Sequence, residues 1–333
     1  MQARLFVLIA AAALTAGTAG AQIDTQRCPS GTAAQRISQD ACQKAIDLFK
    51  YMAPQLGTSI TGGNATLGQG GNLGGLGHFS FGLRVNAVQG SLPQIQNISL
   101  STNGATNTPA IDTKSQLVPM PTADLAVGIF KGLPLAITNV GGIDLLVSAA
   151  YLPEFNGSGV SVKVPNGSLK LGYGARVGIL QESLLVPGIS VSYLVRDLPT
   201  VNIAGNSGGD SLYVNNLSLK TKAWRVVASK NLLLFGLAAG FGQDKYDAST
   251  DISAHVAARP PLSPAANAAA VSISQNLTRT NIFADLSMNL LLFKLNAEIG
   301  QVSGGTINTY NTFSGKQAAD SRIYGSVGAR FGF

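Results

Sequence analysis

The last thirteen residues of this 333-residue chain constrain its fold more than any other stretch. Side chains of an extended strand point alternately to opposite faces, and here the two faces differ in character. One face carries Ile323, Gly325, Val327, Ala329, Phe331 and Phe333, and the other carries Arg322, Tyr324, Ser326, Gly328, Arg330 and Gly332. A soluble protein rarely ends on an exposed apolar strand, because such an edge invites pairing with other chains. A membrane β-barrel can end this way, since closure pairs the strand and lipid solvates its outer face. The alternative is an edge strand of a soluble β-sandwich.

An alternating strand that ends in Phe331 and Phe333 resembles the closing strand of Gram-negative outer-membrane β-barrel proteins. The resemblance covers this end motif and the alternating pattern of the chain, not a long diagnostic signature. It implies an outer-membrane location, outer-membrane lipid around the barrel, and the barrel-assembly machinery as a partner. In that family the machinery recognises the C-terminal aromatic strand, so the resemblance makes Phe331 and Phe333 the assembly signal. The closing strand is expected to pair with the strand that begins near Phe79.

Residues 1–21 have the three parts of a secretory signal peptide. Arg4 supplies the positive charge, residues 5–14 form a short apolar run, and Ala19-Gly20-Ala21 is a small-residue cleavage site. An anchoring helix is the alternative, but this run is too short to span a bilayer. The rest of the chain has no run of about 18 apolar residues, so no membrane-spanning helix is expected.

Cys28 and Cys42 are the only cysteines of the chain. A chain exported to an oxidising compartment is expected to join them in a disulfide. Metal binding would need two more ligands, and the two histidines, His78 and His255, are distant in the sequence. The sequence therefore predicts a Cys28–Cys42 disulfide, no metal site and no cofactor.

Residues 22–77 are interpreted as a plug or hatch segment. Apolar residues recur at helical spacing from residue 33 to about residue 56, opposite a polar face, and Pro54 and Gly57 are expected to mark the helix end. The glycine-rich stretch 58–77 lacks a phosphate-binding motif, so it is expected to pack in the lumen or lead into the barrel wall. The alternative is a peripheral helix that merely caps the barrel end.

Residues 78–333 alternate with a period of two, which predicts an all-β fold: a closed antiparallel transmembrane β-barrel of about 10–14 strands with an N-terminal helical segment. Long and short connections alternate, as in outer-membrane barrels, whose external loops are long and periplasmic turns short. Long connections are expected at 92–121 (with strand extensions near 95–100), 154–167, 202–210, 247–270 and 303–320, and short ones near 133–142, 181–188, 231 and 291. The apolar parity slips near Lys222, which predicts a β-bulge there.

Charged residues collect on the inward parity of these strands. Only 12% of the chain is charged, about half the ~25% usual for soluble domains, and its formal charge of +7 is scattered, so no nucleic-acid partner is predicted. Mid-bilayer Arg or Lys on the lipid side would cost ~2–4 kcal/mol. The predicted lumen-lining residues are Arg84, Asp124, Asp144, Lys170, Arg176, Arg196, Arg279, Asp285, Glu298, Arg322 and Arg330. They either fill the lumen as arginine–carboxylate pairs or line a weakly anion-selective solute path.

The layout of an N-terminal hatch and a barrel is similar in outline to that of long-chain fatty-acid transporters of the outer membrane. The chain departs from that family, because its N-terminal segment has no Asn-Pro-Ala hatch motif. The resulting hypothesis is passive or facilitated passage of small-molecule solutes, hydrophobic ones included. The alternatives are a structural or adhesive barrel with a blocked lumen and, less favoured, a hydrolase. No Gly-x-Ser-x-Gly is present, so an enzyme is not predicted. The sequence leaves the oligomeric state open.

Overall fold

Ten antiparallel strands of the described residues hydrogen-bond in a closed ring, and the last strand pairs back with the first. The computed structural model describes residues 21–157, 160–207, 209–258, 260, 265–290 and 293–332. Residues 1–20 of the predicted signal peptide and the terminal Phe333 lie outside these ranges. The ring runs in the order β1 (Phe79–Pro93), β2 (Thr113–Phe130), β5 (Gly142–Tyr151), β8 (Leu169–Leu180), β9 (Gly188–Asp197), β11 (Asp210–Leu232), β12 (Phe235–Val256), β13 (Ala266–Leu290), β14 (Phe293–Ser303) and β15 (Arg322–Gly332). The predicted closed antiparallel barrel is confirmed.

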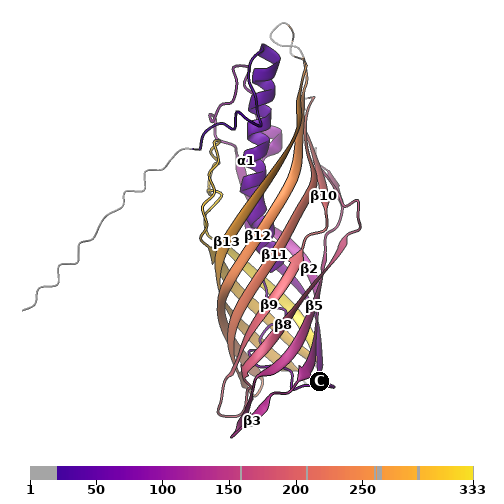
Figure 1. The fold of residues 1–333 in the computed structure, drawn as a ribbon, viewed down its shortest axis with the longest axis vertical. Helices are drawn as coiled ribbons and strands as arrows, with labels where there is room; N and C mark the ends of the chain where they lie inside the picture. Colours follow the sequence, from indigo (N-terminus) through magenta and orange to yellow (C-terminus); the bar gives the residue numbers. More distant parts are fainter. Residues whose placement is uncertain are drawn as a thin grey trace, which may run out of the picture.

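Shorter elements decorate the two ends of the ring. The hairpin of β3 (Leu133–Leu135) and β4 (Thr138–Val140) lies at the end where the C-terminus lies, shown low in Figure 1. At the opposite end, β10 (Val201–Ser207) pairs with β11, and β7 (Val160–Lys163) and β6 (Phe155–Gly157) follow it. The long connections 94–112 and 304–321 also lie there. Outer-membrane barrels keep short turns on the periplasmic side, so this second end faces outward.

The barrel closes along the β15–β1 seam predicted from the sequence. Phe81 of β1 is directly opposite Phe331 of β15, in an uninterrupted antiparallel register. The Phe331 ring lies between two further rings, with centroids 6.3 Å from Phe79 and 5.7 Å from Phe293. An aromatic cluster therefore covers the seam at the periplasmic end.

The outer faces of β11, β12 and β13 pass from lipid to water. The change from apolar to polar outward side chains falls between Trp224 and Lys222, between Phe241 and Gln243, and between Ile282 and Thr280. Above this boundary the inward faces become apolar instead, and Leu219, Ile252 and Ile273 are buried there. The strands thus continue beyond the membrane, with water outside and an apolar filling inside.

Beyond the membrane the outer faces of the strands are polar and the inner faces apolar, and for this reason three connections predicted from the sequence are wrong. Residues 247–256 and 266–270 belong to β12 and β13, not to a loop. The outward residues of 247–256 are polar and residues 266–270 are mostly alanine, so neither stretch shows the apolar outer face of a lipid-facing strand. Residues 202–207 form β10, not a Gly/Asn loop, and 92–93 and 113–121 extend β1 and β2. The strand extension expected near 95–100 is instead a 3-10 helix, η1 (Ile95–Asn97).

The β-bulge predicted at Lys222 is also wrong. Register between β11 and β12 is continuous from Ser218 to Leu232, and the shift falls between Asn215 and Ser218. Asn216 adopts a left-handed conformation there, with φ of 53°. The parity slip near Lys222 reflects the lipid boundary on the outer face.

One helix, α1 (Ala33–Thr61), precedes the barrel among the described residues. It begins with a capping box, in which the Thr32 hydroxyl accepts from the Gln35 backbone and the Gln35 side chain accepts from the Thr32 backbone. Pro54 and Gly57 do not end it, contrary to prediction. Pro54 lacks the N–H that would bond the Lys50 carbonyl, and the Gln275 side chain on β13 donates to that carbonyl instead at 3.4 Å.

Candidate functional site

The interior of the barrel is occupied along its length by residues of the N-terminal segment. Figure 1 shows α1 at the end opposite the C-terminus, with its axis along the barrel. The lumen segment, residues 62–77, continues from the helix toward the periplasmic end, where β1 begins.

The outer half of α1 is the centre of a hydrophobic core. Ala45, Ile46 and Phe49 are buried and pack against inward residues of the extended strands, including Ile252 and Ile273. The predicted Cys28–Cys42 disulfide is present and belongs to the same core. Burial of this apolar surface stabilises the contact between helix and strands by roughly 25 cal/mol per Å².

Two acidic residues of α1 hold the long connections against it. Asp40 accepts from the Ser101 and Thr106 backbones at 2.7 and 2.9 Å and pairs with Lys44 at 2.6 Å. Asp47 accepts two bonds from Asn311, each of 2.8 Å. Burial raises the pKa of Asp47, and the bonds from Asn311 offset part of that shift.

An aromatic stack fixes the second long connection. The Tyr51 ring stacks on Phe313 with centroids 3.9 Å apart, and the Tyr51 hydroxyl donates to the Lys316 carbonyl at 2.9 Å. The Arg322 guanidinium also lies over the Tyr51 ring, 5.8 Å from its centroid. We call α1, residues 94–112 and 304–321, and the outer ends of β10–β13 the outer platform.

The C-terminal end of α1 is capped by the barrel wall. A helix leaves its last four carbonyls without partners and carries partial negative charge there, and α1 has no basic residue in its last turn. Side chains of the barrel wall donate to these backbone carbonyls and to those just after the helix. Arg84 donates to the Gly62 carbonyl (2.8 Å), and Asn86 donates to those of Ser59 (2.6 Å) and Thr58 (3.3 Å). Arg196 donates to the carbonyls of Ile60 (3.4 Å), Thr61 (3.4 Å) and Gly63 (3.3 Å), and Arg225 donates to that of Thr61 (3.3 Å). Three inward arginines are therefore committed to the helix end.

The same arginines pair with buried carboxylates. Arg84 lies 2.5 Å and Arg196 3.6 Å from Asp124, and Arg225 lies 2.5 Å from Asp244. Below them, Arg176 lies 2.7 Å from Asp144. These pairs neutralise much of the inward positive charge that the sequence assigned to the lumen.

The lumen segment makes polar contacts with the remaining inward groups. Gly63 and Asn64 donate their backbone N–H groups to Glu298 at 3.1 and 3.0 Å, and Leu73 donates to Asp144 at 3.1 Å. Gly70 passes so close to the wall that a Cβ there would lie 2.5 Å from the Ser229 nitrogen. Glycine is required at that position because the two backbones nearly touch.

Most of the inward charges predicted from the sequence are buried inside the ring. Those at most 5% exposed are Arg84, Asp124, Asp144, Arg176, Arg196, Arg279, Asp285, Glu298 and Arg322. Arg330 is half-buried and donates to Gln69 at 2.9 Å. Lys170 does not line the lumen: it is exposed at the outer rim, since β8 begins one residue earlier.

Two charged residues of this interior were missed from the sequence. Arg225 lies beside the supposed bulge at Lys222, which obscured its inward parity. Asp244 lies just before the stretch expected to be a loop. Continuous alternation through β11 and β12 would have assigned both to the interior.

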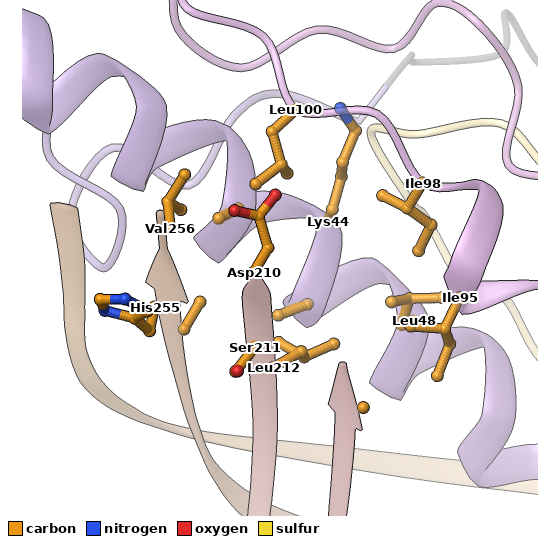
Figure 2. A pocket seen from close by; sticks show the side chains of 14 residues that line it. Lys44, Leu48, Ile95, Ile98, Leu100, Asp210, Ser211, Leu212, His255 and Val256 are labelled. Atoms are coloured by element: carbon orange, nitrogen blue, oxygen red, sulfur yellow. The ribbon is translucent and has the colours of Figure 1, made fainter. Parts of the chain in front are cut away.

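Two of the cavities formed by the described residues differ in character. Apolar side chains converge on a small cavity of about 50 Å³ in the outer platform, from α1, residues 95–100, β11 and β12 (Figure 2). A polar vestibule of about 600 Å³ opens at the periplasmic end, lined by Gln69, Glu182, Lys294 and Arg330 among others. The first can hold only a small aliphatic group, and the second can admit hydrated solutes as far as the lumen segment.

Potential metal ligands do not cluster in the described residues. No group of three or more metal-binding side chains occurs among them. His78 begins β1 at the periplasmic end, whereas His255 lies near the outer end of β12, where Nδ1 lies 2.6 Å from Asn267. Within the part of the chain described, no helix is long and apolar enough to cross a membrane.

No protein-family model and no curated protein match the chain. Among solved structures it is similar to the transport unit of the autotransporter AIDA-I from Escherichia coli, at 8% identity and a TM-score of 0.36, covering 90% of this chain and 99% of that one. It is also similar to Ail of Yersinia pestis, at 10% identity and a TM-score of 0.26, covering 77% of this chain and 97% of that one. A third similar structure is the toluene transporter TbuX of Ralstonia pickettii, at 11% identity and a TM-score of 0.29, covering 84% of this chain and 97% of that one. Similarities this weak identify no function for this chain.

The closed ring, its apolar outer band and its polar interior define a transmembrane β-barrel of the outer-membrane type. The chain is an outer-membrane β-barrel whose own N-terminal segment lies inside it.

Proposed function

We propose that the protein is a closed outer-membrane barrel that acts through its outer platform, in a structural or adhesive role, and not through bulk passage of solutes. The observation that supports this most is the packing of α1. The helix is the hydrophobic core of the outer half, so it is as integral to the fold as the strands around it. In this proposal residues 22–77 are a permanent plug.

The polar contacts below α1 support the same proposal. Wall arginines bond helix carbonyls, and wall carboxylates accept from the lumen segment. Withdrawing the segment would leave buried charges and carbonyls without partners, at roughly 1–3 kcal/mol for each group and more for charged ones. A segment held in this way does not leave the barrel under thermal motion alone.

Passage of small solutes is the second candidate, and the periplasmic vestibule favours it. The vestibule reaches Gln69 and Arg330, where only residues 62–77 separate it from the outer half. These residues are irregular and glycine-rich, so a rearrangement confined to them could open a narrow path. The half-buried Arg330 would favour anions at that point.

Planar-bilayer conductance distinguishes the two candidates. The full chain is expected to show no unitary conductance, and a variant lacking residues 22–77 is expected to conduct. A heat-dependent shift in gel mobility would establish that each variant is folded. If the shorter variant does not fold, Gly70→Val provides a second test: its side chain would push the lumen segment from the wall and produce a leak. Steady conductance by the full chain, with chloride favoured over potassium, would overturn the closed barrel and support passage.

A further inference from the structure

Two lysines lie side by side on the outer face of the barrel. Lys222 of β11 is directly opposite Lys245 of β12 in the antiparallel register, and both are exposed. Directly opposed side chains have Cβ atoms about 5 Å apart, and like charges at that distance destabilise a sheet. The row continues with Val195 on one side and Thr278 on the other, which supply no negative charge.

The next row outward is composed differently. Lys220 is directly opposite Asp197 on β9 and Asp247 on β12, so a carboxylate lies in the register position on each side of it. Only one of these carboxylates reaches toward the lysine pair: Asp247 lies 3.9 Å from Lys245, with side chains 32% and 55% exposed. Lys222 therefore has no carboxylate opposite it on either neighbouring strand.

The lysine pair lies immediately above the lipid boundary of the outer leaflet. The outward residue directly below Lys222 is Trp224, whose ring meets Phe241 edge-on at a centroid distance of 6.0 Å. Tyr193 is directly opposite Trp224 on β9 and is half-exposed. Aromatic residues of membrane barrels gather at the interface between hydrocarbon and headgroups. Side chains one step further out therefore reach the headgroup layer.

We propose that Lys222 and Lys245 bind a phosphate group of a phosphorylated lipid in the outer leaflet. The anion would lie between the two ammonium groups and relieve their repulsion, while the acyl chains would lie along Trp224, Phe241 and Tyr193. A soluble anion would use only the lysines, whereas a lipid uses both the lysines and the aromatic row. This site is independent of whether the lumen is open or closed.

Trp224 provides the measurement, because it is the only tryptophan of the chain and lies on the same face as Lys222. The full chain, folded in uncharged detergent with EDTA, is titrated with hexa-acylated diphosphoryl lipid A while its emission is recorded. The comparison probes are the same lipid without phosphates and inorganic phosphate alone. We expect saturable binding of the phosphorylated lipid at concentrations where neither comparison probe changes the emission.

Three variants complete the experiment. Each basic residue near anionic lipid contributes roughly a factor of five, so K222Q/K245Q is expected to weaken binding about 30-fold. The matched control K220Q removes the lysine that lies opposite two carboxylates in the register, and it is expected to change binding less than about twofold. K222Q alone should fall between them. Equal binding of the phosphate-free lipid, an equal response to inorganic phosphate, or full affinity in the double variant would each overturn the proposal.

Discussion

A methyl group added at Gly57 tests how closely α1 contacts the wall. Gly57 lies inside the helix, where alanine is ordinarily preferred. A Cβ at this position would lie 2.7–2.9 Å from three atoms of the Tyr246 ring. That ring is 2% exposed, and its hydroxyl lies 3.2 Å from Thr61 and 3.3 Å from Asp244, so it has little room to turn.

Two opposing effects set the magnitude. Replacing glycine by alanine within a helix stabilises by about 0.8–1.0 kcal/mol. Forcing extra volume into a packed interior costs about 1–3 kcal/mol. Gly57→Ala is therefore expected to be net destabilising, by about 1 kcal/mol, in the native chain. In a Tyr246→Ala background the ring is gone, so the same change is expected to stabilise by about 1 kcal/mol.

Urea unfolding followed by Trp224 emission gives the four free energies of this double-mutant cycle. The sign of the Gly57→Ala effect must differ between the two backgrounds. A stabilisation of about 1 kcal/mol in both backgrounds would show that α1 does not press against β12 and would refute the close packing inferred here.

Two further predictions concern charges of the interior and the platform. Arg225→Met leaves the buried carboxylate of Asp244 without its cation, and we expect a loss of about 3–5 kcal/mol in the same unfolding assay, largely recovered when Asp244→Asn is added; equal stability of the single and double variants would contradict this. Burial raises the pKa of Asp47 above its ordinary value when residues 304–321 are docked against α1. Docking therefore takes up a proton. It is expected to become stronger as the pH falls from neutrality through the raised pKa toward the unperturbed pKa. The protection factor of the Asn311 amide, which is its exchange rate relative to the intrinsic rate at the same pH, should rise over that range. Asp47→Asn should abolish the pH dependence of this protection factor.

The sequence predicted the membrane-spanning part of the fold because one physical rule governs it. Between lipid and a polar lumen, alternation is strict, and it placed the strand faces from Phe79 to Phe331. The rule fails where the surroundings change. Beyond the boundary at Trp224, water lies outside the barrel instead of lipid, and α1 lies inside it instead of a polar lumen. Strands there have small polar residues on the outer face and apolar residues on the inner face, and from the sequence alone this pattern predicts loops.

The interior contacts could be predicted only in part. Charge parity placed Arg84 and Arg196 inside the ring, but no pattern in the strands indicates that they bond the carbonyls of a helix. The sequence predicts a helix end at Pro54, because the donor that replaces its missing N–H, Gln275, lies on a strand 221 residues later and meets the Lys50 carbonyl only in the folded structure.

We expect α1 to enter the barrel from the outer end, so that residues 22–32 lie on the cell surface although the C-terminal end of β15 lies on the periplasmic side. Antibody labelling of intact cells tests it directly, with one short epitope inserted after Ile23 and another after Leu184 in a periplasmic turn. We expect the Ile23 epitope to be labelled on intact cells and the Leu184 epitope only after permeabilisation. An Ile23 epitope that is reached only after permeabilisation would contradict it.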